Sequence, residues 1–340
     1  MLRFLGRRAL FAIVSMWGLA TAVFLMIKVI PGDEAAVAAG ESATPEMIEQ
    51  TRQRLGLDQP LPVQYVAFLS RLVRGDLGSS ITSYQPVTTT LADLLPYTLE
   101  MVAAAMLLSL VVAVPVAVLL VSRRGGPIDT VGRVLTVIVA GMPVFWIGFV
   151  VIYFVAQNRV LPVSGTISLQ YAVPRVTGFL TIDSLLAGDG AAFCDVLAHL
   201  VLPAIVLGLT QSAVIIRTLR TSLINEQHED YVLLARAKGG SPLRVLITHA
   251  LRNSAVATIA TLGLQVGYLI AGSVIVESLF ARPGIGSYLA NSVTQKDTFA
   301  VLGAVLFVGA VVIVMSFLVD LAQLAIDPRV RAQTLRGARA

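Results

Sequence analysis

Long apolar runs, separated by polar segments of unequal length, form the main pattern of this chain. A helix that crosses a hydrocarbon layer of about 30 Å needs about 20 mostly apolar residues. The pattern therefore predicts an all-α, polytopic membrane protein with six transmembrane helices. Pro115 and Pro143 are expected to bend two of them, which membrane bundles tolerate. The runs lie near residues 10–30, 97–122, 132–156, 196–216, 254–279 and 299–325.

The composition excludes a water-soluble globule. Of the 340 residues, 56% are hydrophobic and only 13% are charged, which leaves too little polar surface to cover the apolar remainder. Basic residues before the first apolar run also suit a signal peptide. However, the run from Ala9 to Ile27 exceeds a usual signal core and no small-x-small cleavage site follows it. We therefore expect a first transmembrane helix.

Lys and Arg residues concentrate in alternate segments between the predicted spans. Short cytoplasmic segments carry an excess of these residues, so this side should be cytoplasmic. Both termini then face inward, and segments 31–96 and 157–195 face outward. The net charge of +5 reflects this bias and not a nucleic-acid partner, because the sequence has no basic aromatic patch. The inward residues are Arg3, Arg7, Arg8, Arg123, Arg124, Arg133, Arg217, Arg220, Arg236, Lys238, Arg244, Arg252, Arg329, Arg331, Arg336 and Arg339.

The first outward segment is longer than a connection between two spans requires. Thr44-Pro45 predicts a helix start, Leu55-Gly56 its end, and Pro62 to Leu72 a second amphipathic helix. Two compatible roles are a cap over the external mouth and a docking surface for an extracytoplasmic protein. The second outward segment holds the only cysteine, Cys194, so an intrachain disulfide is excluded.

A hydrophilic stretch from Glu229 to Asn253 separates the fourth and fifth apolar runs. Acidic Glu229 and Asp230 suit the positive end of a helix dipole, and basic Arg236 and Lys238 suit the negative end. The stretch therefore predicts a first helix of roughly ten residues, about 15 Å long. On it, one face holds Tyr231, Leu234, Ala235 and Lys238.

Gly239-Gly240 suits a left-handed exit from this helix, after which Ser241 can cap a second helix and Pro242 fits its first turn. The small residues Ala237 and Gly239 would let the backbone of another protein approach closely. We interpret the stretch as an external surface for a soluble partner. An amphipathic helix resting on the membrane is the alternative.

The sequence offers no site for chemistry of its own. It has no GxxxxGK[ST] phosphate loop, no HExxH or GxSxG motif and no acid pair, so we expect no catalytic, cofactor-binding or metal-binding residues. Energy must come from a partner or from an ion gradient. An ion-coupled secondary transporter would carry charges near the middle of the membrane, whereas Glu100, Glu277 and Asp320 lie toward helix ends.

Polar residues in the fifth apolar run are candidates to line a translocation path. Thr261, Gln265 and Tyr268 follow helical spacing on one stripe, and Ser273 lies further along. Polar groups in a span prefer a neighbouring helix or a wet cavity to lipid. Hydrogen bonding between helices is therefore the alternative to a path.

The hydrophilic stretch resembles the cytoplasmic EAA loop of permease subunits in bacterial ABC importers, especially the dipeptide and oligopeptide branch. The resemblance rests on Asp230-Tyr231-Val232, Ala235 to Gly239 and His249 to Asn253, while Leu233 and Leu234 depart from the general motif. Further similar segments are Pro31 to Asp33, Leu55 to Asp58, Gly75 to Gly78, Met142 to Trp146, Leu161 to Gly165, Leu202 to Gly208, Glu277 to Phe280, Pro283 to Gly286 and Asp327 to Arg329.

The resemblance implies a type I importer permease of the bacterial inner membrane, the first of a pair. Its implied partners are a second homologous permease, two cytoplasmic ATPases that bind the ATP, an extracytoplasmic solute-binding protein, the membrane lipid and a peptide substrate. Nickel, haem and glutathione remain alternative solutes. The implied domains are 1–96, a core of 97–328 with the loop at 221–253, and a tail of 329–340. The implied ATPase-coupling residues are Asp230, Tyr231, Ala235, Arg236, Ala237, Lys238 and Gly239.

Overall fold

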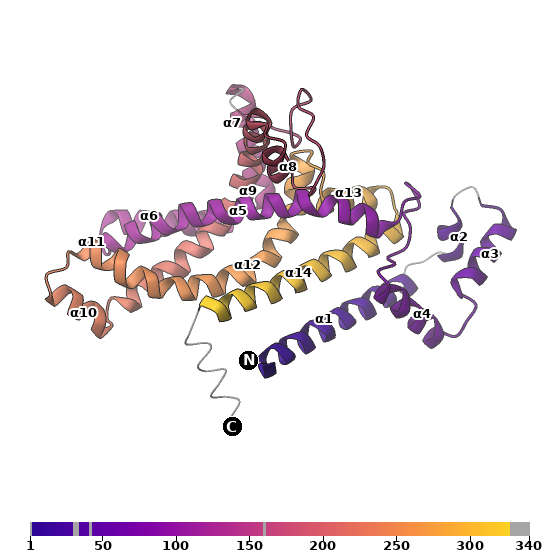
Figure 1. The fold of residues 1–340 in the computed structure, drawn as a ribbon, viewed down its shortest axis with the longest axis horizontal. Coiled ribbons are helices and arrows are strands. Elements are labelled where there is room, and N and C mark those ends of the chain that lie inside the picture. The colour runs from indigo at the N-terminus through magenta and orange to yellow at the C-terminus, as the bar shows by residue number, and fades with distance from the viewer. Residues whose placement is uncertain (1, 30–33, 41–42, 159–160, 327–340) are drawn as a thin grey trace. The chain divides into compact units, whose positions relative to one another are not determined.

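The computed structural model describes residues 2–29, 34–40, 43–158 and 161–326 (Figure 1). Within these ranges the chain is helical, and its only β-pairing is an isolated bridge between Ser79 and Pro86. Among the described residues, five helices are long and apolar enough to cross a membrane, and a bent helix pair would make a sixth span if it counts as one. The five are α1 (Leu2–Val29), α5 (Val87–Ser122), α9 (Gly190–Glu226), α12 (Leu251–Leu279) and α14 (Thr298–Ile326).

The third predicted span is two helices and not one. Helix α6 (Pro127–Gly141) and helix α7 (Val144–Asn158) meet at an angle of 104°. Pro143 lacks an N–H and disfavours helical backbone at the residue before it, and Met142 is accordingly extended, with φ −76° and ψ 131°. The expected bend is therefore a complete break, which makes this segment a broken span or a re-entrant loop.

Two of the helices are longer than the membrane is thick. At 1.5 Å per residue, the 36 residues of α5 and the 37 residues of α9 extend about 55 Å, against about 30 Å of hydrocarbon. Both contain proline without ending, at Pro96 and Pro115 in α5 and at Pro203 in α9. The ends of these helices can therefore carry polar sites outside the lipid.

The chain folds into two compact units. The first unit contains residues 96–287 and the end of α14 from Met315, and the second contains residues 2–95 and 288–314. The remaining helices are α2 (Glu34–Ala39), α3 (Pro45–Leu55), α4 (Leu61–Val73), α8 (Leu180–Leu186), α10 (Asp230–Ala237), α11 (Pro242–Val245), a π-helical turn η1 (Leu246–Ala250) and α13 (Ile285–Thr294).

Helix α9 is the centre of the first unit and packs against α6, α7, α8 and α12. Small residues let the helices approach, as expected where lipid supplies no hydrophobic drive for association. A Cβ on Gly208 would lie only 2.7 Å from the Ala105 carbonyl of α5, and one on Gly148 of α7 would lie 2.2 Å from Leu279 of α12. Toward one end, apolar side chains of α5, α9 and η1 form a buried cluster around Leu219.

An ionised aspartate organises the segment that precedes α8, which the basic residues predict to face outward. Asp183 is buried and accepts hydrogen bonds from the Val176, Thr177 and Gly178 N–H groups and from the Thr177 hydroxyl. Burial alone would raise the pKa of Asp183, but these hydrogen bonds to the carboxylate hold it below its usual value. The loop is therefore a defined structure.

In the second unit, both predicted outward helices are present. Thr44 caps α3 by accepting a hydrogen bond from the Met47 N–H at 3.3 Å, and Gly56 ends it in the left-handed region, with φ +66°. Helix α4 occupies the second amphipathic run. The Pro31 to Asp33 element, the Asp327 to Arg329 element and the tail lie outside the described residues.

Candidate coupling loop and its connections to the membrane core

The hydrophilic loop lies at one end of the first unit, where α10 and α11 project beyond α9 and α12 (Figure 1). Helix α10 starts after an extended Glu229, with Asp230 in its first turn and Arg236 in its last. Helix α11 starts after an extended Ser241, with Pro242 at its first position. The predicted helix, break and helix are therefore confirmed.

The two glycines of the break serve different purposes. Gly239 has φ +87°, so it is required for its conformation, and nothing lies within 4 Å of the position where its Cβ would be. A Cβ on Gly240, in contrast, would lie 2.9 Å from the Ala235 carbonyl oxygen and 2.7 Å from Val245. The predicted left-handed exit is confirmed at Gly239, whereas the close packing at Gly240 was not foreseen.

Helix α10 presents an apolar surface to its surroundings. Val232 is the buried residue of this helix, at 1% exposed, whereas the Leu233 and Leu234 side chains are 49% and 57% exposed. On the following segment, Leu243 and Ile247 are also exposed, at 52% and 47%. Helical spacing predicted that Leu234, Tyr231 and Ala235 share one face of the helix. In the structure Tyr231 and Ala235 are half-buried, whereas Leu234 is exposed. The remaining predicted coupling residues, Asp230, Arg236, Ala237, Lys238 and Gly239, are exposed.

Tyr231 fastens the loop to the membrane helices on both sides. Its hydroxyl donates a hydrogen bond to the Glu226 carboxylate at the end of α9, and it also interacts with the Asn253 side chain at the start of α12. Burial, together with the bond to Glu226, raises the pKa of Tyr231, so the phenol keeps its proton at neutral pH. Movement of α10 would thus pull directly on α9 and α12.

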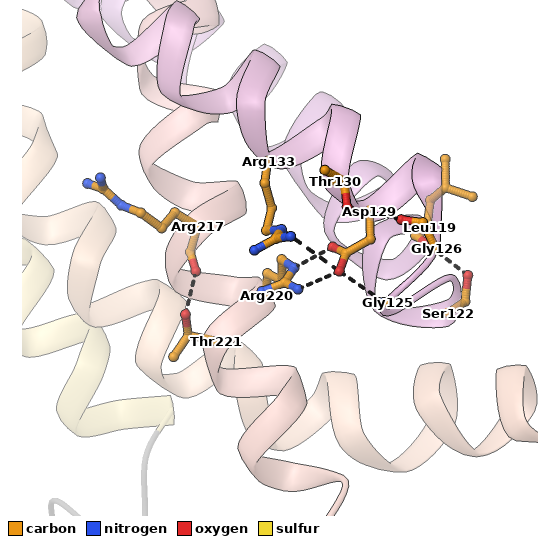
Figure 2. A network of polar contacts seen from close by, with 10 residues as sticks. All are labelled: Leu119, Ser122, Gly125, Gly126, Asp129, Thr130, Arg133, Arg217, Arg220 and Thr221. Carbon is orange, nitrogen blue, oxygen red and sulfur yellow. Dashed lines mark hydrogen bonds and ion pairs between the residues drawn. The ribbon is translucent and has the colours of Figure 1, made fainter.

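A buried ion pair connects α9 to the turn between α5 and α6 (Figure 2). Asp129, in the first turn of α6, is 2% exposed. Arg220 of α9 binds both of its carboxylate oxygens, with Nε at 2.9 Å from Oδ1 and Nη2 at 2.8 Å from Oδ2. The Gly125 N–H donates to Oδ2 at 3.2 Å, and Arg133 lies at 3.9 Å, whereas Arg217 points away.

This bidentate geometry is the strong form of an arginine–carboxylate contact. It places a fixed connection between α9 and α6 just ahead of the hydrophilic loop. Sequence reasoning counted Arg133 and Arg220 only as markers of the cytoplasmic side and missed Asp129. An acid after Gly125-Gly126-Pro127 was the available signal, but nothing local indicates its partner.

A second buried carboxylate, Glu277, lies near the C-terminal end of α12, at the other end of this helix from the hydrophilic loop. Glu277 is 1% exposed and accepts hydrogen bonds from the Thr98 hydroxyl of α5 at 2.6 Å and the Ser287 N–H at 2.9 Å. The Thr98 hydroxyl in turn accepts the Ile285 N–H at 2.9 Å. A Cβ on Gly284 would lie 2.3 Å from the Glu277 carboxyl carbon. The glycines of the Pro283 to Gly286 segment therefore make room for this carboxylate.

Arg282, in the same turn, fastens two further segments. It is 1% exposed and donates from Nη1 to the Gly165 carbonyl at 3.2 Å and to the His199 carbonyl of α9 at 3.5 Å. Burial lowers the pKa of Arg282, and the nearby Glu100 and Glu277 carboxylates oppose that lowering. The Glu277-to-Gly286 segment thus joins α5, α9 and the loop around Gly165 at this end of the unit.

Comparison with known proteins assigns this architecture to a family. The family described as "Binding-protein-dependent transport system inner membrane component" matches residues 109–332, and its N-terminal companion, "Binding-prot-dependent transport system membrane comp, N-term", matches residues 1–102. The chain belongs to this transporter family. It is a multi-pass permease of the inner membrane.

Named relatives cover almost the whole permease. A di/tripeptide transport system permease protein of Pseudomonas aeruginosa is 40% identical over 98% of this chain and 100% of its own length. A dipeptide transport system permease protein of Escherichia coli is 38% identical over 97% and 99%. A probable D,D-dipeptide transport system permease protein of Escherichia coli is 36% identical over 92% and 95%.

The polar residues proposed to line a path in this permease have different surroundings. On α12, Thr261 is half-buried, the Gln265 carbonyl accepts a hydrogen bond from Gln211 of α9 at 3.4 Å, and Tyr268 is 74% exposed. Ser273 is 1% exposed and its hydroxyl donates to the Ile270 carbonyl of its own helix. The four do not share one surface in this conformation, and a path along them stays a prediction.

Proposed function

We propose that this permease forms one half of the translocation path of a peptide importer and is driven by cytoplasmic ATPases through α10 and α11. The observation that carries the proposal is the exposed apolar surface of Leu233 and Leu234 on a short helix that is anchored through Val232 and Tyr231. Exposed apolar patches on a polar loop are typical of protein interfaces. The relatives named as dipeptide permeases support peptides as the solute.

The proposed complex contains this chain, a second homologous permease, two ATPase subunits and an extracytoplasmic solute-binding protein. When the ATPases close, they displace α10, and the Tyr231 bond to Glu226 transfers the displacement to α9. The Asp129–Arg220 pair then carries it to α6. In this mechanism the chain supplies no catalytic group, and solute choice belongs mainly to the binding protein.

Uptake in reconstituted vesicles tests the proposed solute. The complex, assembled with its own ATPases and binding protein and supplied with ATP, should accumulate a labelled dipeptide. Nickel, haem and glutathione, each offered with the same binding protein, provide the comparison. Accumulation of one of these in place of the dipeptide would contradict a peptide importer.

Replacing Gly239 by valine should block coupling without preventing insertion. A side chain at φ +87° costs roughly 1–2 kcal/mol, and the added bulk projects from the exposed loop surface. We expect both solute uptake and the ATP hydrolysis stimulated by the solute-binding protein to fall to background in reconstituted vesicles. A pull-down of the ATPase subunits tests assembly of the complex. Gly188→Val is the matched control, because Gly188 has φ +69° and equally open surroundings far from the loop. Normal uptake by Gly239→Val would favour a helix that merely rests on the membrane.

The orientation proposed from the basic residues predicts that the loop end of the first unit is cytoplasmic. Cys194 is exposed near the start of α9, at the other end of that helix from the loop. A membrane-impermeant thiol reagent should therefore label Cys194 in cells whose outer membrane has been made permeable while the inner membrane stays intact. A Cys194→Ser, Arg236→Cys variant should label only after the inner membrane is opened. The reverse pattern would invert the topology.

A further inference from the structure

A cavity of about 280 Å³ lies within the second unit, and none of its lining residues belongs to the hydrophilic loop. Three helices build its walls from apolar side chains. They are Val23, Phe24 and Ile27 of α1, Phe68 and Leu72 of α4, and Phe299, Leu302 and Leu306 of α14. Most of these residues belong to one apolar cluster that holds the three helices together.

The polar part of the lining is predominantly basic. Among the described residues it contains three cationic side chains, Lys28, Arg54 and Arg71, against a single acid, Asp76. Asp76 already accepts the Gly78 N–H at 2.9 Å, and the Lys28 ammonium donates to Gln64 at 2.6 Å while lying 5.6 Å above the Phe24 ring. The site therefore has an excess of positive charge beside an apolar wall.

The position of the cavity along the helices relates it to the membrane surface. Lys28 is in the last turn of α1, whose apolar span is Gly6–Val29, and Leu302 is near the start of α14, whose apolar span begins at Thr298. The basic residues thus lie where both spans leave the lipid, and the apolar walls continue into it. An amphiphile with a negative head has the complementary arrangement.

We propose that this cavity binds an anionic phospholipid. The phosphate lies among Arg54, Arg71 and Lys28, and the first part of an acyl chain lies against Phe68, Leu72 and Leu306. The volume is close to the lower end of the range of roughly 300–1,000 Å³ for pockets that enclose small ligands, so it holds the head and the beginning of the chain. The rest of the acyl chain follows the lipid-facing side of α1, where the Leu25 and Met26 side chains are more than half exposed.

The lipid comes from the outer leaflet if the proposed orientation of the termini holds. On the cytoplasmic side of membranes, basic pockets between transmembrane helices bind acidic headgroups, and each cation near an anionic surface strengthens the attraction. The same charge complementarity would act on an anionic headgroup in the outer leaflet. The site lies in the unit that contains the long outward segment. A bound lipid would therefore stabilise α4 against α1 and α14 independently of transport.

The test is retention of lipid by the full chain, purified with its partner permease in mild detergent and examined by native mass spectrometry. Dioleoyl phosphatidylglycerol should be retained roughly tenfold more than dioleoyl phosphatidylcholine, given two or more cations at the headgroup. The Arg54→Gln, Arg71→Gln double variant should lose that preference. Arg74→Gln is the matched control, because Arg74 is an exposed arginine next to the end of α4 that does not line the cavity.

A Leu72→Trp variant tests the apolar half, since it fills the cavity and leaves every charge in place. It should also reduce retention of phosphatidylglycerol.

Equal retention of the two lipids, or full retention by both the double-arginine and Leu72→Trp variants, would overturn the proposal. Displacement of the lipid by inorganic phosphate would show a phosphate site, and displacement by a dipeptide would show a solute site, so either would also overturn it. Since none of these measurements involves uptake, they are independent of the proposed function.

Discussion

Gly286→Ala should prevent this permease from accumulating in the membrane. A Cβ at this position would lie 2.4 Å from the Val274 Cα and 2.7 Å from the Val274 nitrogen. These are backbone atoms of α12 and cannot move aside as the end of a flexible side chain can. Overpacking a tight site typically costs about 1–3 kcal/mol, and a clash with backbone on this scale belongs at the upper end or above it. Quantitative immunoblotting of membranes measures the loss.

The control for this variant is Gly141→Ala. Gly141 is also a helical glycine in an apolar segment, at the end of α6, and nothing lies within 4 Å of its Cβ position. It should accumulate as the wild type does. Gly284→Ala should be intermediate, because the nearest atoms there belong to the Glu277 side chain, which can rotate at the cost of its hydrogen bonds. Normal accumulation and uptake by Gly286→Ala would show that α12 and the following turn are not packed as described.

Arg220→Met should destabilise the first unit strongly by leaving the Asp129 carboxylate buried without its main partner. Breaking a buried ion pair from one side costs on the order of 3 kcal/mol, which we expect to be reduced here because the Arg220 side chain is 17% exposed. The variant should unfold at a lower temperature in detergent and couple ATP hydrolysis poorly to uptake. Thermal denaturation followed by tryptophan fluorescence and vesicle uptake measure the two effects.

A double variant separates the charge from the packing. Asp129→Leu combined with Arg220→Met removes both charges and should recover most of the stability, since apolar replacement of a buried pair is often neutral. Arg217→Met is the control for losing a cation on the same helix, because Arg217 is exposed and points away from Asp129. If the double variant is as unstable as Arg220→Met alone, Arg220 acts through contacts other than Asp129.

Local signals were sufficient for most of the secondary structure. The Thr44 cap, the left-handed Gly56 and the left-handed Gly239 each follow from the conformational preferences of one residue and its neighbours. The same is true of the helix, break and helix in the coupling loop. The exception is the segment around Pro143, where hydropathy predicted one span and the chain breaks by 104°. Pro143 predicted a bend there, but the angle of the bend depends on what α6 and α7 each pack against.

The sequence by itself determined five of the apolar helices and the helix, break and helix of the hydrophilic loop, because each is encoded over a short stretch of chain, whereas the cytoplasmic position and the coupling role of that loop stay predictions. Only the tertiary structure decided which buried charges meet. Asp129 and Arg220 are 91 residues apart, and Thr98 and Glu277 are 179 apart. It also decided that Gly240 and Gly286 are needed for space, since that depends on Ala235 and Val274 backbone atoms. Hydropathy and capping act between neighbours in sequence, whereas a charge pair or a close contact is specified only once the helices are packed.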